Sequence, residues 1–198
     1  MKRLIYTFVG LLISWTMTVG LTCEKRRVEV PVGNSAVTPI EVNSSNSNYS
    51  DDGMYDAYDD VDKIKEDNGF LEILSVHLEG ITYKIVENNS APNTMTSGYI
   101  QVSSSPDGPF HNLVQITNLD IGAIMNIEQT PDLIAEGVAE IDAALSPLIS
   151  GISKFESKEI YFRIQGTASP APPPNVNFKI EVKVYLAVIG VVEVDVPA

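Results

Sequence analysis

The sequence predicts a mainly β protein, an antiparallel β-sandwich-like domain that carries one amphipathic α-helix. Three patterns lead to this prediction. Apolar and polar residues alternate in several short runs, most clearly over residues 176–188, as in half-buried antiparallel strands. Segments rich in proline and glycine separate these runs. One stretch, about residues 131–152, instead repeats its apolar residues at steps of three and four, as one face of a helix requires.

The chain starts in the order of a secretory signal. Lys2 and Arg3 precede an apolar run over residues 4–19, and small residues then lead to Cys23, the single cysteine of the chain. This arrangement resembles the lipobox of bacterial lipoproteins, and the resemblance covers residues 1–23 only. It implies that residues 1–22 are a signal peptide and that Cys23 is lipidated and becomes the new N-terminus.

Two positions depart from the lipobox pattern. Gly20 and Thr22 stand where the family prefers Leu and a Gly or Ala. Two alternatives to lipidation stay open: an uncleaved membrane anchor over residues 4–22, which is close to the length that spans a bilayer, and cleavage without lipid. All three place residues 28–198 outside the cytoplasm or on its boundary.

Residues 23–69 are predicted to be the lipidated cysteine followed by a flexible tether. The run NSSNSNYS and the acidic stretch over residues 51–67 contain too little apolar surface to offset the entropy of ordering. Clustered carboxylates raise a calcium hypothesis, but no glycine lies where an EF-hand loop turns, so we expect a solvated linker and no metal site. The residues considered for such a site are Asp59, Asp60, Asp62 and Asp67.

Residues 70–198 are predicted to form a single β-rich domain. Its first strand has apolar residues at even positions up to Leu78 and at odd positions from Ile81, and this change of phase at Gly80 predicts a β-bulge or a sharp bend. Short strands follow around residues 99–103 and 113–119.

The predicted helix begins at Thr130-Pro131-Asp132, which offers a capping hydroxyl, a proline at the first helical position and an acid on the positive end of the helix dipole. Pro147 predicts a break near Ser146. We expect the apolar stripe to pack on a sheet, with an apolar ligand or a partner as its alternative occupant. The stripe consists of Ile134, Val138, Ile141, Leu145, Leu148 and Ile152.

Two alternating runs near the C-terminus, residues 160–164 and 176–188, are predicted to pair as a hairpin around the proline-rich segment 169–174. A hairpin centred on Pro172 sets Arg163 opposite Glu181, an opposite-charge pair that supports the register.

Composition excludes several functions. The formal net charge of −13 disfavours nucleic acid and anionic membrane surfaces. A single cysteine excludes an internal disulfide and a cysteine zinc site. The sequence lacks HExxH, GxSxG, P-loop and GxGxxG motifs, and its two histidines, His77 and His111, are expected to be structural. We therefore expect no enzyme, no cofactor and no nucleotide.

The function expected from these patterns is that of a cell-envelope lipoprotein, on the outer membrane, the periplasmic face or the cell surface. It would be held to the membrane by lipid and bind a protein, a glycan or an envelope component without catalysis. The alternative is a carrier of a lipid or another apolar ligand, enclosed by the sheet and the helical stripe. A core dominated by Val and Ile favours the first function, because the whole chain has only 6 Phe and 5 Met.

Overall fold

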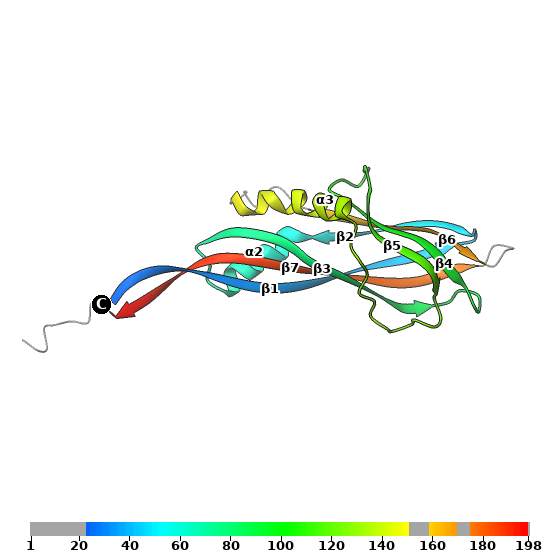
Figure 1. Ribbon diagram of the computed structural model, residues 1–198, viewed down its shortest axis with the longest axis horizontal. Coiled ribbons are helices and arrows are strands. Elements are labelled where there is room, and N and C mark those ends of the chain that lie inside the picture. Colours follow the sequence, from blue (N-terminus) through cyan, green and yellow to red (C-terminus); the bar gives the residue numbers. More distant parts are fainter. Residues whose placement is uncertain (1–22, 151–158, 170–174, 198) are drawn as a thin grey trace, which may run out of the picture.

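The computed structural model describes residues 23–150, 159–169 and 175–197, so the predicted signal peptide and most of the proline-rich segment lie outside the described residues. Figure 1 shows the elements of the described part. In chain order they are β1 (Cys23–Ser44), β2 (Asn48–Asp56), α2 (Ala57–Asp67), β3 (Glu72–Asn88), β4 (Met95–Ser103), β5 (His111–Asp120), α3 (Ala135–Leu145), the 3₁₀ helix η1 (Ser146–Ser150), β6 (Glu159–Ser169) and β7 (Val176–Pro197).

The strands form two antiparallel sheets, one in the order β1-β7-β3 and the other in the order β2-β6-β4-β5. The sheets pack face to face, and the predicted mainly β, sandwich-like fold is confirmed. Their facing sides supply the core, including Phe162 and Ile164 from one sheet and Ile180 and Val182 from the other, each at most 1% exposed. Alternating apolar residues of both sheets are thereby removed from water.

β1 and β7 extend beyond the sandwich as a two-stranded ribbon (Figure 1). They pair along their whole length, from Cys23 opposite Pro197 to Ser44 opposite Val176. β3 joins this sheet only from Glu72, opposite Val191, so within the described part of the chain no third strand pairs with the outer residues of the ribbon.

The predicted tether over residues 23–69 is wrong, because this segment forms β1, β2 and α2 and contributes to the core. Ile40 and Val42 of β1 are each 1% exposed, and Tyr49 of β2 is 4% exposed. Two prolines, Pro31 and Pro39, lie within β1. They are compatible with a strand because β1 lies at the edge of its sheet, where half of the backbone N–H groups have no strand to donate to.

The acidic part of this segment is helical for a local reason. Asp56 accepts hydrogen bonds on its side chain from the backbone N–H groups of Tyr58 and Asp59, which caps the first turn of α2. Ala57, Val61 and Ile64 then occupy one face and are buried. The domain consequently begins with β1 rather than at residue 70, and one apolar face was enough to order an acidic helix.

The predicted C-terminal hairpin is also wrong. β6 pairs with β2 and β4, whereas β7 pairs with β1 and β3, so the two runs lie in different sheets. Arg163 bonds to Asp52 of β2 with its Nε and Nη2 at 2.7 and 2.8 Å, and Glu181 pairs with Lys84 of β3 at 3.3 Å. Alternation identifies which face of a strand is buried, but it does not identify the neighbouring strand.

Other local predictions are confirmed. The register of β3 against β7 shifts between Leu78 and Gly80, at the predicted bulge. The predicted strands over residues 99–103 and 113–119 lie within β4 and β5, which pair with each other. A further shift between Ile73 and Ser75 buries Ile73 and leaves Leu74 39% exposed, which the even-numbered phase did not predict.

The predicted helix exists but is shorter than expected. Helix α3 begins at Ala135, because the residues before it continue along β5: Ile134 donates its N–H to the carbonyl of Leu113 at 2.8 Å. The start at Thr130-Pro131-Asp132 is therefore wrong. The break at Ser146 is confirmed, since the α-helix gives way there to η1.

Candidate functional site

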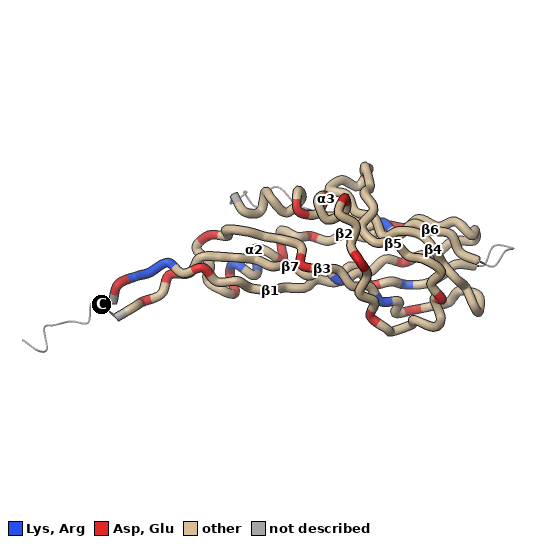
Figure 2. The backbone as a smooth tube through the Cα atoms, viewed as in Figure 1, with Lys and Arg blue, Asp and Glu red and all other residues tan. Residues whose placement is uncertain are grey.

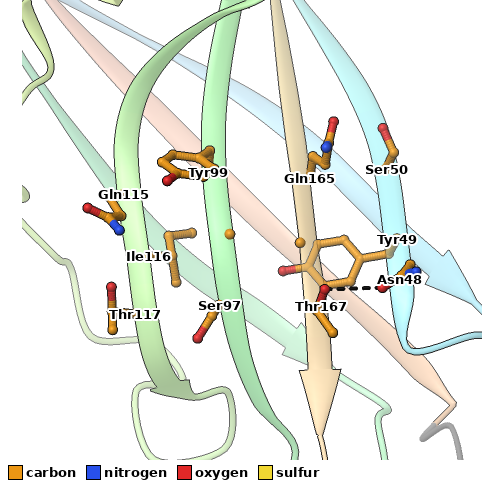
Figure 3. Close-up of a pocket in the computed structure, with 12 residues that line it drawn as sticks. Asn48, Tyr49, Ser50, Ser97, Tyr99, Gln115, Ile116, Thr117, Gln165 and Thr167 are labelled. Carbon is orange, nitrogen blue, oxygen red and sulfur yellow. Dashed lines mark hydrogen bonds between the residues drawn. The ribbon is translucent and has the colours of Figure 1, made fainter.

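A groove of about 780 Å³ lies on the four-stranded sheet and crosses all four of its strands (Figure 3). Alternation along each strand sends one set of side chains into the core and the other set outward. The exposed or half-exposed polar residues of the groove come from this second set, and they include Asn48, Ser97, Tyr99, Gln115, Gln165 and Thr167. Figure 3 shows them distributed over β2, β6, β4 and β5.

Two glycines shape the floor of this groove. Gly98 of β4 and Gly166 of β6 are directly paired, and a Cβ on Gly98 would lie only 2.0 Å from the carbonyl oxygen of Gln165. A Cβ on Gly166 would lie 2.5 Å from the hydroxyl of Tyr49. The backbones therefore approach more closely than any larger residue would permit.

Tyr49 anchors the floor to the opposite sheet. Its ring is buried, meets the ring of Phe178 on β7 edge to face at 5.7 Å, and its hydroxyl is hydrogen-bonded to the hydroxyl of Thr96. Burial raises the pKa of Tyr49, so the phenol is neutral at physiological pH. A rigid, uncharged base consequently supports the polar surface above it.

The polar groups of the groove are neutral, because none of the described residues that line it is Asp, Glu, Lys, Arg or His. Thr167 donates a hydrogen bond to the Asn48 side chain at 3.1 Å (dashed in Figure 3). Among the described residues, the side chains of Gln115, Gln165 and Tyr99 have no hydrogen-bond partner. Their amide and hydroxyl groups can both donate and accept hydrogen bonds to a ligand.

Sequence reasoning missed this groove. Its signal is present, since each strand supplies consecutive outward residues that are polar but uncharged, such as Ser97 with Tyr99 and Gln165 with Thr167. The sequence does not say that these pairs lie side by side, because that depends on the order β2-β6-β4-β5.

The predicted apolar stripe of α3 packs on the sheets. Ile141 and Leu145 are completely buried, and Leu148 is 7% exposed. Val138 is partly buried against the core, Ile134 occupies the N-cap position without a side-chain hydrogen bond, and Ile152 lies outside the described residues. A Cβ on Gly137 would lie 2.6 Å from the Cα of Leu113, so helix and sheet are in close contact. The stripe offers little surface to a ligand or a partner.

The other predicted candidates have structural places. Within the described part of the chain, no group of three or more His, Cys, Asp or Glu side chains is arranged to hold a metal ion. His111 of β5 pairs with Glu136 of α3, Nδ1 to Oε1 at 2.7 Å, which links the helix to the sheet. His77 is exposed on β3.

Cys23 begins β1 at the tip of the ribbon. Basic residues follow it in β1, and Figure 2 shows acidic residues in the same ribbon. Lys25 lies 2.5 Å from Glu193, and Arg27 lies 3.3 Å from Glu72. No helix among the described residues is long and apolar enough to cross a membrane.

Comparison with known proteins gives no family. No family model matches the chain, and no curated protein matches it. Among solved structures, the chain is similar to one described as the structure of turnip yellow mosaic virus at 100 K, with 12% identity over 88% of this chain and 99% of the viral one. The TM-score is 0.28, too low to support any conclusion about fold or function.

Proposed function

We propose that the protein is an exported, lipid-anchored binding module of the cell envelope, without catalytic activity, and that its groove on the four-stranded sheet binds a neutral glycan. One observation carries the choice of ligand: the groove is lined by amides, hydroxyls and an aromatic ring and by no charged side chain, in a chain with 26 acidic and 13 basic residues.

The chemistry of the groove supports a polyhydroxylated ligand. Each sugar hydroxyl can donate and accept a hydrogen bond. The side-chain amides of Gln115 and Gln165 can accept from it through their oxygen and donate to it through their NH₂ group. The ring of Tyr99 is half-exposed and supplies apolar area for the C–H face of a pyranose. A ligand with carboxylates would find no cation in the groove and would be repelled by the acidic chain.

The ribbon supports an anchored arrangement. Cys23 lies at one end of β1, and the groove residue Asn48 follows the other end by a short turn (Figure 1). A strand of 22 residues at about 3.3 Å per residue is roughly 70 Å long. Lipidation of Cys23 would thus hold the groove far from the membrane, at the opposite end of β1.

The ligand is tested by calorimetric titration with neutral oligosaccharides and with matched oligosaccharides that contain uronic acids. We expect heat of binding for neutral sugars and none for their acidic counterparts. Gln165→Ala should weaken binding at least threefold. Gln129→Ala removes the same side chain from a loop outside the groove and should bind as the unchanged protein does. Equal binding of neutral and acidic sugars, or no binding of either, would contradict the proposed ligand.

The anchor is tested separately. The chain expressed with its own leader should partition into the detergent phase of a cloud-point extraction, and Cys23→Ala should move it to the aqueous phase. A variant that still partitions into detergent would rule out lipidation at Cys23.

A further inference from the structure

A second groove, of about 770 Å³, lies between the open edge of β1 and the end of β2 with helix α2. On the β1 side it follows residues 32–38, and on the other side it reaches from Met54 to Asn68. It shares no residue with the groove on the four-stranded sheet.

The direction of the β1 backbone groups follows from β7, which lies between β1 and β3. The carbonyls of Asn177 and Val191 accept hydrogen bonds from the N–H groups of Asn89 and Leu71, on the β3 side, at 2.7 and 2.8 Å. Odd-numbered residues of β7 therefore face β3, and even-numbered residues face β1. The even-numbered residues of β7 pair with even-numbered residues of β1, for example Val188 with Val32.

The odd-numbered residues of β1 consequently direct their N–H and C=O groups away from the sheet. Two observations agree with this. Pro31 and Pro39 are odd-numbered, so no N–H is missing from the ladder with β7. The backbone N–H of Asn43 reaches the carboxylate of Asp51 on β2 and lowers its pKa, although burial raises that pKa more.

On the ribbon side of Pro39, over residues 32–38, the edge of β1 is open. A Cβ on Gly53 of β2 would lie 3.1 Å from the carbonyl oxygen of Pro39, so β2 covers the edge there. Towards the ribbon, β2 ends at Asp56 and α2 replaces it. Gly33, Ser35 and Val37 then present their backbone groups to the groove, and no strand among the described residues pairs with them.

The walls of the groove suit an extended peptide with basic side chains. Val37 and Met54 are each 51% exposed and face solvent as large apolar side chains. The hydroxyl of Tyr55 is buried, on a residue that is only 5% exposed, and among the described residues it interacts with the carboxylate of Asp60 without a well-formed hydrogen bond.

The groove is acidic. Asp56, Asp59, Asp60 and Asp67 line it against a single cation, Lys63. Burial raises the pKa of Tyr55, and the charge of Asp60 raises it further, so the phenol stays protonated and able to donate.

We propose that this groove binds an extended, basic segment of a partner protein, which adds to β1 as a further strand. The prolines at 31 and 39 limit the paired stretch to about five residues, from Gly33 to Val37. Alternate side chains of the segment would contact the apolar wall, and the intervening Lys or Arg residues would reach the aspartates of α2. Pairing of β1 with β1 of a second copy is disfavoured, because it would bring two acidic α2 helices together.

The test uses fluorescence anisotropy with labelled five-residue peptides of alternating Lys and Val or of alternating Glu and Val. The Lys peptide should bind the full mature chain, with an affinity that falls as salt is raised. Ser35→Pro removes the central outward N–H, a change that β1 already tolerates at 31 and 39, and should weaken binding at least tenfold.

Asp59→Asn with Asp60→Asn should weaken binding of the Lys peptide at least threefold, whereas Asp132→Asn, outside the groove, should leave it unchanged. Equal binding of the Lys and Glu peptides would overturn the proposal. Unchanged binding by Ser35→Pro would exclude strand addition. Sedimentation that shows a dimer lost in Ser35→Pro, with no peptide binding, would assign the edge to a second copy instead.

Discussion

Replacing Gly98 by Ala tests the close approach of β4 and β6 that shapes the floor of the polar groove. The added Cβ would lie 2.0 Å from the Gln165 carbonyl oxygen and 2.5 Å from the Cα of Gly166, and both are backbone atoms that no rotamer change can move. The two strands must separate, which breaks ladder hydrogen bonds or opens the core below them.

The cost can be worked out from these contacts. Overpacking a close-packed site costs about 1–3 kcal/mol, and contact with backbone places this variant at the upper end. The substitution also lowers the conformational entropy of the unfolded chain, which offsets about 0.5–1 kcal/mol of this destabilisation. The net decrease in the free energy of unfolding is about 2 kcal/mol, which lowers Tm by roughly 4–8 °C in a chain of this size.

Gly33→Ala is the matched control, because a Cβ there meets nothing within 4 Å. It should keep or slightly raise Tm. Chemical denaturation followed by circular dichroism, together with calorimetric melting, measures both variants. If Gly98→Ala melts within a degree of Gly33→Ala, the two strands are not as close as described and the account of the groove floor is wrong.

Three further predictions concern pairing, pH and folding. A double-mutant cycle of Arg163→Ala with Asp52→Ala should give a coupling free energy of about 0.5–1 kcal/mol, because both side chains are partly exposed. The same cycle with Arg163 and Glu181 should give no coupling, and a measurable coupling would favour the hairpin predicted from the sequence. Burial raises the pKa of Tyr55 above the ordinary tyrosine value of 10.0, so the free energy of unfolding should fall as the pH rises above 10.0. Tyr55→Phe should make that decline shallower by about 1.4 kcal/mol per pH unit. Equal slopes for the two proteins in alkaline denaturation would contradict this. A chain that begins at Phe70 should fail to fold, because β7 would lose its entire pairing with β1. A dispersed NMR spectrum of that shortened chain would show that it folds without β1 and would contradict this prediction.

Several elements of the fold could be predicted because their causes are local. The alternation of apolar residues in β6 and β7 reflects burial of one face, and it identified the inward side chains of these two strands correctly. The phase change at Gly80 and the helix break at Ser146 also depend only on nearby residues, namely a bulge and the following proline.

The N-terminal strand shows how a local signal can be misinterpreted. Val30, Val32, Ile40 and Val42 keep the even-numbered phase of a strand, and Pro31 and Pro39 lie at odd positions between them. Those prolines lie at positions directed away from β7, where their missing N–H groups remove no hydrogen bond from the ladder, and only the sheet order shows that β1 is an edge strand.

Sequence patterns alone were enough for the fold class, the phase of β6, β7 and most of β3, the lipobox-like order around Cys23 and the absence of the catalytic motifs considered. The tertiary structure alone decided which strands are neighbours. That choice separated β6 from β7, gave Arg163 its partner Asp52, brought uncharged side chains of four strands into one groove and left β1 open beside an acidic helix. The physical reason is that alternation records only the burial of a face, whereas strand order depends on contacts between segments distant in the chain.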